Sequence, residues 1–193
     1  FNYERFTGDL TYIPEMGLEV LIAISRFWAE RVNYSENKKA YVILGVTGPN
    51  EYENNVNNNW YTNYLAQWCL LYTSKEILKI KKMYPQHWNK IKQKVSWQES
   101  EIDKWNQIAT QIHFPRHPEN DIFLQQEGFL DKTIIPASSI DKSERPINQH
   151  WSWYRILRSP FIKQADVLQG LYLFEENFDY EFIKKHFDFY EPL

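Results

Sequence analysis

The stretch Gly45-Val46-Thr47-Gly48-Pro49-Asn50-Glu51-Tyr52 separates two long segments of helical pattern and is followed by the asparagine-rich run 54–63. Glycine and proline interrupt regular structure, so we expect Glu51 on a loop of fixed shape. The amide side chains around it supply hydrogen-bond donors and acceptors without charge. A carboxylate among amides and aromatic rings suits a sugar, which presents hydroxyl groups and apolar ring faces.

Helical periodicity extends on both sides of this stretch. Apolar residues recur at helical spacing over 14–32, and a second long helix is expected over 58–83, with Asn57 or Asn58 as its N-cap. Further helices are predicted over 86–95, 97–113 and 159–176, and from Asp179 to about Tyr190. The helix over 97–113 is predicted because Ser96-Trp97-Gln98-Glu99 matches a capping box.

Regular structure is sparse in the rest of the chain. Only 41–46 has β character, 113–148 contains several prolines and is expected to be loop, and 151–158 fits no single pattern. No low-complexity linker divides the chain, and no repeat of fixed period is present. The sequence therefore predicts a mainly α region with long loops and little β structure. Long loops inside a helical domain often carry functional sites.

Composition limits the classes of function. A hydrophobic fraction of 43% in 193 residues is enough for one sizeable core. The net charge of −3 comes from interspersed acids and bases, which gives little support to a nucleic-acid partner. Cys69 is the only cysteine, so an internal disulfide is excluded and a buried thiol is expected. No apolar run approaches the ~20 residues of a membrane span, so we expect no membrane partner and a cytoplasmic location.

Several segments together resemble glycoside hydrolase family 65. Residues 46–52, with the asparagine run, resemble the acid loop of that family, and 161–168 look like its Lys-Gln-Ala-Asp segment. The stretches 27–31 and 126–129 also fit, and 145–153 look most like the members of the family that act on maltose. Because two separate motifs occur in the right order over nearly the whole chain, the resemblance is specific.

The resemblance implies an (α/α)6 barrel of paired helices, a six-hairpin glycosidase-like fold. Residues 1–193 would form the C-terminal part of the catalytic domain, without the N-terminal domain, the first barrel helices and the C-terminal domain. The family's phosphate loop would also be absent, because it follows the Tyr-Glu-Pro segment near residue 190. The chain alone is therefore expected to be catalytically inactive and to self-associate through apolar faces left by an incomplete barrel.

The resemblance also implies a reaction, the inverting phosphorolysis of an α-glucosidic disaccharide. Maltose and phosphate would give glucose and β-glucose 1-phosphate, with one carboxylic acid as proton donor and phosphate as the nucleophile. Disaccharide and phosphate would be the partners, without cofactor or metal, and the full-length protein would be a homodimer. Kojibiose or trehalose phosphorylase, or a hydrolase of the same family, remain alternatives. A non-catalytic helical interaction module is a rival of another class, but it predicts repeats that are not seen.

Glu51 is the expected general acid, because it occupies the acid position of the motif. A general acid must be protonated near neutral pH, so we expect an enclosed site that raises its pKa. The competing interpretation is a loop glutamate that faces water, as most glutamates do. The chain departs from the commonest form of the loop, Gly-Pro-Asp-Glu-Tyr-His, because Asn50 replaces the aspartate and Glu53 stands where histidine is common. Asn50 thereby removes a like charge beside Glu51, whereas Glu53 puts a charge back two residues on, and the sequence leaves open which effect is larger.

By resemblance, Lys163 and Gln164 are expected to contact glucose hydroxyls, with the lysine close to phosphate. In the sequence they would begin the helix over 159–176, and an exposed helix start is the competing interpretation. Asp166 is expected to be an inward structural partner. The asparagines of the run, Asn55 and Asn57 to Asn59, are expected to shape and cap the loop more than to bind substrate.

Three aromatic residues near the Lys-Gln-Ala-Asp segment are candidates for the acceptor-sugar subsite. His150, Trp151 and Trp153 could line it, because indole faces stack well on glucose. An aromatic core is an equally good interpretation of the same residues, since large aromatic side chains fill most protein cores.

Overall fold

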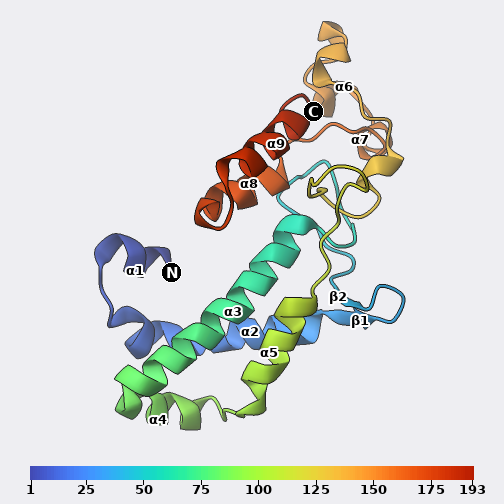
Figure 1. Ribbon diagram of the computed structural model, residues 1–193. Helices are drawn as coiled ribbons and strands as arrows, with labels where there is room; N and C mark the ends of the chain where they lie inside the picture. Colours follow the sequence, from blue (N-terminus) through green and yellow to red (C-terminus); the bar gives the residue numbers. More distant parts are fainter. The chain divides into compact units, whose positions relative to one another are not determined.

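The computed structural model describes all residues, 1–193, and they form two compact units (Figure 1). The first unit contains Phe1–Tyr41 and Leu65–Ile112, and the second contains Val42–Tyr64 and His113–Leu193. The long helix α3 (Trp60–Met83) begins in the second unit and continues in the first.

The first unit is built from helices around an apolar core. In chain order it contains α1 (Asn2–Thr7), a π-helical turn (Ile13–Gly17), α2 (Leu18–Arg31), strands β1 (Asn33–Ser35) and β2 (Ala40–Val42), most of α3, then α4 (Pro85–Lys94) and α5 (Ser100–Gln111). Ser25 Oγ of α2 donates to Thr73 Oγ1 of α3 at 2.9 Å. Gln67 Nε2 of α3 donates to the carbonyl of Ala109 in α5 at 2.6 Å. Both α2 and α5 therefore pack against α3.

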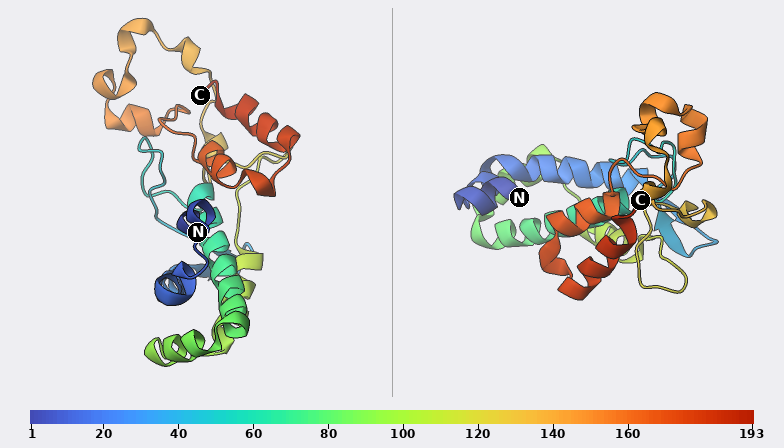
Figure 2. Two further views of the ribbon diagram at one scale, coloured as in Figure 1. Left: turned by 90° about the vertical axis from the view of Figure 1, so that its left-hand side faces the viewer. Right: turned by 90° about the horizontal axis from the view of Figure 1, so that it is seen from above.

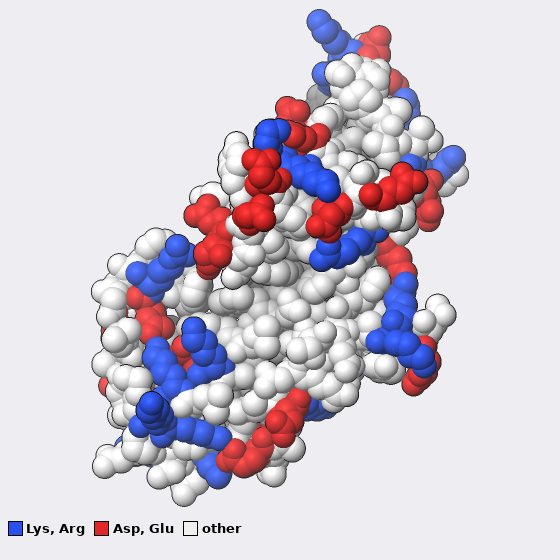
Figure 3. All heavy atoms as spheres, in the orientation of Figure 1, with Lys and Arg blue, Asp and Glu red and all other residues white.

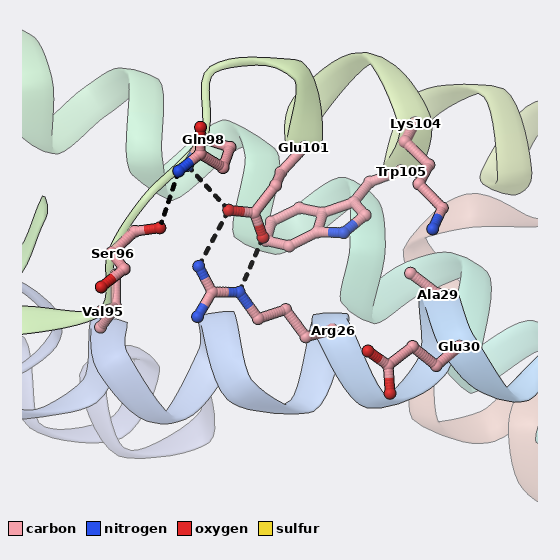
Figure 4. Close-up of a pocket in the computed structure, with 9 residues that line it drawn as sticks. All are labelled: Arg26, Ala29, Glu30, Val95, Ser96, Gln98, Glu101, Lys104 and Trp105. Atoms are coloured by element: carbon pink, nitrogen blue, oxygen red, sulfur yellow. Dashed lines mark hydrogen bonds and ion pairs between the residues drawn. The ribbon is translucent and has the colours of Figure 1, made fainter.

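A two-pronged ion pair joins α2 to α5 (Figure 4). Arg26 Nε lies 2.7 Å from Glu101 Oε2, and Arg26 Nη2 lies 2.8 Å from Glu101 Oε1, beside a cavity of about 320 Å³. Burial opposes ionisation of Glu101, but hydrogen bonds from Arg26 and from the backbone N–H of Gln98 outweigh it and lower the pKa of Glu101. The charges at this cavity thus serve helix packing.

The second unit has short helices separated by long loops. It contains 3-10 turns at Phe129–Asp131, Ala137–Ser139, Lys142–Glu144 and Glu175–Asn177, and helices α6 (Ile147–His150), α7 (Trp153–Leu157), α8 (Asp166–Leu173) and α9 (Tyr180–Tyr190). Helices α8 and α9 lie side by side (Figure 2). A Cβ on Gly170 would overlap the indole of Trp60, so α8 approaches the start of α3 closely only because residue 170 is glycine.

The fold class is confirmed as mainly α, part of an (α/α)6 barrel, with long loops and little β structure. The strand expected over 41–46 is shorter than predicted, because β2 ends at Val42. Cys69 is buried, as expected, and Asp179 caps α9 by accepting the N–H of Phe182.

None of the helices combines the length and the apolar character that a membrane span requires. Acidic and basic side chains are interspersed on the face drawn in Figure 3.

The predicted start of α3 was wrong by two residues. The N-cap is neither Asn57 nor Asn58: Asn59 Oδ1 accepts the N–H of Thr62 at 3.0 Å, and the helix begins at Trp60. Asn58 is instead held by its own loop contacts, described below.

The capping box predicted at Ser96 does not form, and α5 begins at Ser100 instead of Trp97. Ser96 has φ +50°, which is not an N-cap conformation. The indole of Trp97 is buried between those of Trp88 and Trp105, with centroids 5.6 and 5.5 Å away. Packing of this aromatic side chain therefore overrides the local sequence signal.

The helix predicted over 159–176 is shorter at both ends and covers only Asp166–Leu173. Lys163 and Gln164 consequently lie on the loop before α8 and not in a first helical turn. The physical reason is a competing hydrogen bond, since the backbone N–H of Lys163 donates to Asn50 Oδ1 at 3.0 Å. The ambiguous segment 151–158 contains the short helix α7.

Candidate active site

The loop that carries Glu51 is closed by its own backbone. Val46 and Val56 exchange both backbone hydrogen bonds at 2.9 Å, which forms an antiparallel bridge at the neck of the loop. Asn57 Oδ1 accepts the N–H of Gly45 at 3.0 Å, and Asn58 Oδ1 accepts the N–H of Ile43 at 3.1 Å. These asparagines shape the loop, as the sequence predicts. We call residues 46–56 the acid loop.

The acid loop rests on a buried carboxylate. Asp166 is only 1% exposed, and its Oδ2 accepts a hydrogen bond from Asn59 Nδ2 at 2.7 Å. A Cβ on Gly48 would overlap both of these polar groups, so this close approach requires glycine. Burial raises the pKa of Asp166 to about 6, although the hydrogen bond from the Asn59 side chain acts in the opposite direction. Asp166 is thus the inward partner that was expected.

A third segment connects the two residues that follow the acid loop, Asn57 and Asn58, to the loop before α8. Asn58 Nδ2 donates to Glu127 Oε2 at 2.8 Å, and the N–H of Glu127 donates to the carbonyl of Asn57 at 3.0 Å. Gln125 Nε2 in turn donates to the carbonyl of Gln164 at 3.0 Å. Three of the stretches that carry the resemblance, 46–52, 126–129 and 161–168, are therefore assembled around one place in the second unit.

Glu51 and Lys163 meet at this place. Lys163 Nζ forms an ion pair with Glu51 Oε2, although the two residues are 112 positions apart in the sequence. Their side chains are 65% and 46% exposed, so residues of this chain do not provide the enclosure expected around Glu51. The pair is an open carboxylate and ammonium presented to solvent.

Asn50 is a site residue whose part the sequence interpretation missed. It is 1% exposed, and its Oδ1 accepts the backbone N–H of Lys163 at 3.0 Å and that of Tyr52 at 3.3 Å. The sequence did mark this position, because asparagine stands there in place of the commonest aspartate. The role of Asn50 could not be predicted from that, since it depends on a contact with Lys163 that only the fold brings about.

A buried ion pair between Glu53 and Lys132 was also missed. The two side chains are 10% and 14% exposed and lie in direct contact. Burial lowers the pKa of Lys132 to about 8, and the adjacent Glu53 carboxylate opposes that change because it favours the ammonium form. The carboxylate of Glu53 is therefore engaged and shielded from solvent. Nothing in the sequence near Lys132 marks it as a partner.

Trp151 packs with the same two loops that carry Glu51 and Lys163. It lies against a small apolar cluster of Ile147, Ile156 and Phe161, on which Tyr52 also packs. Its ring centroid is 5.6 Å from that of Phe161, and the guanidinium of Arg155 lies 3.7 Å from its ring centroid. Trp151 and Phe161 line a cavity of about 420 Å³.

The other predicted binding residues are less closely grouped. Trp153 is 46% exposed at the start of α7, and His150 is exposed at the end of α6. Neither lines the cavity beside Trp151. The side chain of Gln164 is exposed, and only its carbonyl is tied into the site.

The site presents groups suited to an anion and a polar ligand. Lys163 offers an exposed ammonium group, and Arg155 and Arg158 are among the residues that line the cavity beside Trp151. Arg155 is paired with Glu144, and Arg158 donates to the hydroxyl of Tyr154. No group of three or more His, Cys, Asp or Glu side chains is arranged to hold a metal ion.

Comparison with characterised proteins identifies relatives over the full chain. A maltose phosphorylase of Bacillus subtilis (strain 168) is 49% identical over 193 residues. An α,α-trehalose phosphorylase of Thermoanaerobacter brockii is 35% identical, and a kojibiose phosphorylase of Halothermothrix orenii is 34% identical. Each comparison covers 100% of this chain and 25% of the relative, so the chain spans a quarter of the length of these proteins.

Structure comparison agrees with the sequence matches. A solved structure of a human-microbiome protein, provisionally described as a kojibiose phosphorylase, superposes with a TM-score of 0.87 at 31% identity. It covers 99% of this chain and 25% of that protein. The model of the glycosyl hydrolase family 65 central catalytic domain matches residues 1–193. The chain belongs to glycosyl hydrolase family 65, within its central catalytic domain.

Proposed function

We propose that this chain carries the proton donor of an inverting disaccharide phosphorylase, with maltose as the disaccharide. Glu51 is the general acid, and inorganic phosphate is the nucleophile. Lys163 and Gln164 bind the glucosyl unit, Lys163 also faces the phosphate, and Trp151 lines the subsite of the leaving glucose. The active site would include residues outside this chain, since the relatives are four times as long.

The observation that carries the proposal is the partner of Glu51, which is a cation. An inverting hydrolase needs a second carboxylate, about 6.5–9.5 Å from the acid, to activate water. Within this chain, Glu53 and Asp166 are unsuited to that task, because Glu53 is paired with Lys132 and Asp166 is buried against Asn59. An exposed ammonium beside the acid instead favours an anionic nucleophile, which needs no base.

The proposed reaction is a single displacement. The Glu51 carboxyl gives its proton to the glycosidic oxygen as the bond from that oxygen to C1 of the glucosyl unit breaks. A phosphate oxygen forms the new bond to C1 from the opposite face, which inverts the α configuration to β. The ammonium of Lys163 offsets negative charge as phosphate approaches the sugar. Glucose and β-glucose 1-phosphate leave, and Glu51 takes up a proton before the next cycle.

Maltose is proposed because of the identity ranking among the relatives. The relative described as a maltose phosphorylase is 49% identical, against 34–35% for those described as kojibiose and trehalose phosphorylases. Each of the three comparisons covers 100% of this chain, so the difference in identity does not reflect coverage.

The test uses the longest natural protein that contains this chain, called the parent protein below. It is incubated with maltose, kojibiose or trehalose, each with and without phosphate, and the sugar products are identified. We expect phosphate-dependent consumption of maltose above the other two. Preference for kojibiose or trehalose would overturn the choice of disaccharide, and inactivity toward all three would overturn the proposed function.

A further inference from the structure

The acid loop, which carries Glu51, is held at two points by the segment that carries Lys163, and the first point is Asn50. Its Oδ1 accepts the backbone N–H of Lys163 at 3.0 Å. Two residues earlier in the acid loop, Gly48 lies directly against the carboxylate of Asp166, with no room for a side chain between them. We propose that Asn50 and Asp166 are positioning residues, which form a two-point clamp that sets the place of Glu51 relative to Lys163. This inference rests on the proposed function.

The two ends of the clamp are fixed to the rest of the second unit. Asp166 is the first residue of α8, and its Oδ2 is held by Asn59, which caps the start of α3. Gly48 lies against both residues without room for a side chain. Asn50 and Asp166 are each 1% exposed, so water does not compete for their hydrogen bonds.

The ion pair between Glu51 and Lys163 cannot by itself hold the two loops together. Both side chains are largely exposed, and exposed ion pairs contribute little to the stability of a fold. The buried hydrogen bond of Asn50 and the close contact of Gly48 with Asp166 are therefore the stronger connection. It follows that the distance between proton donor and cation is set by residues that touch neither substrate.

The identity of residue 50 fits this role. Aspartate would offer the same acceptor oxygen to the N–H groups of Lys163 and Tyr52, but it would bury a second negative charge next to Asp166. Two carboxylates in one buried site raise the pKa of one of them. Asparagine keeps the acceptor without the repulsion, so Asn50→Asp is the conservative variant and Asn50→Ala is the variant that removes the clamp.

The first experiment compares two substrates in the parent protein with phosphate present. Maltose needs proton donation to its leaving oxygen, whereas α-glucosyl fluoride releases an anion that does not. We expect Asn50→Ala to lower kcat on maltose by about 100-fold, as for other small misplacements of reacting groups, and to affect the fluoride much less. Asn50→Asp should restore most of the turnover on maltose. Asn54→Ala, an exposed position on the acid loop, is the matched control and should leave both rates unchanged.

Equal losses on both substrates would overturn the positioning role, because a general loss of structure affects both. Asp166→Asn provides a second variant, in which the side chain keeps its shape but only one of its two acceptor oxygens. It should show the same selective loss on maltose. A wild-type rate for Asn50→Ala on maltose would also overturn the proposal.

The second experiment does not depend on activity. Hydrogen exchange of the Lys163 and Tyr52 amides is measured in the parent protein, since both donate to Asn50 Oδ1. Exchange at both amides should be faster in Asn50→Ala and return toward wild type in Asn50→Asp. Unchanged protection would overturn the clamp. If the wild type consumed no disaccharide, the proposed function would fail, while this result would still decide whether the clamp exists.

Discussion

Lys163 Nζ and Glu51 Oε2 form an ion pair between two loops that are 112 residues apart in the sequence. Neither side chain is buried, so the pair is presented to solvent instead of being used to hold the fold together. In the proposed reaction Glu51 has to carry a proton, so the ion pair opens before proton transfer, and Lys163 is then left to face the anion.

Glu51→Gln tests the proton donor directly. The amide has nearly the same shape but cannot protonate a leaving group, so turnover of maltose by the parent protein should fall by about 100-fold or more. Turnover of α-glucosyl fluoride with phosphate should persist, because fluoride leaves without a proton. Circular dichroism checks that the fold is intact. Retained activity on maltose would remove Glu51 from the mechanism.

Gly48→Ala tests the close packing beneath the acid loop. The added methyl group would overlap Asn59 Nδ2 and Asp166 Oδ2, and overpacking of this kind costs about 1–3 kcal/mol. We expect a lower melting temperature and slower phosphorolysis in the parent protein. Gly8→Ala is the control, because φ at Gly8 is +70° and nothing lies within 4 Å of the added carbon. It introduces backbone strain without overlap and should leave turnover unchanged.

Asp166 predicts a particular dependence of stability on pH. Its pKa rises from 3.8 to about 6 on folding because burial disfavours the charged form. Between these values the folded state binds more protons than the unfolded state, so stability falls as pH rises from about 4 to 6 and is then constant. The full change corresponds to about 3 kcal/mol.

The measurement is the difference in melting temperature between the parent protein and Asp166→Asn at pH 4 to 7. Asparagine does not titrate, so wild type should lose its relative advantage as pH rises through this window. A difference that stays constant with pH would show that Asp166 has the same pKa in both states.

Trp151→Ala tests the proposed subsite of the leaving glucose. In the reverse direction, glucose must bind as acceptor, and loss of the indole face should raise its KM by about tenfold. Trp153→Ala is the matched comparison, because Trp153 lies outside the cavity that Trp151 lines. An equal or larger increase in KM for Trp153→Ala would contradict this assignment and indicate that the subsite lies beside Trp153.

Local patterns predicted most of the helices but placed some of their ends wrongly. The periodicity of 14–32 and 58–83 sufficed for α2 and α3, since both helices have buried residues at helical spacing along their length. The capping box at Ser96 was misleading because Trp97 is drawn into an aromatic core. The start of α8 is set by a hydrogen bond from Lys163 to Asn50, and no local pattern reports a contact over that separation.

The site was predictable in its residues and not in its arrangement. The Gly-Pro turn indicated Glu51 on a loop, and the resemblance indicated Lys163, yet their pairing required the fold. The burial of Asp166 and the contact between Glu53 and Lys132 depend on which segments of the chain lie next to each other in the folded protein. Such contacts leave no periodic mark in the sequence.

The central claim is that a single acid acts with phosphate as the nucleophile. Its most direct test is proton NMR of the parent protein with maltose, recorded with and without phosphate. The account predicts β-glucose 1-phosphate and glucose in equal amounts, formed only when phosphate is present. Release of glucose alone at a rate independent of phosphate, or formation of the α anomer, would contradict it.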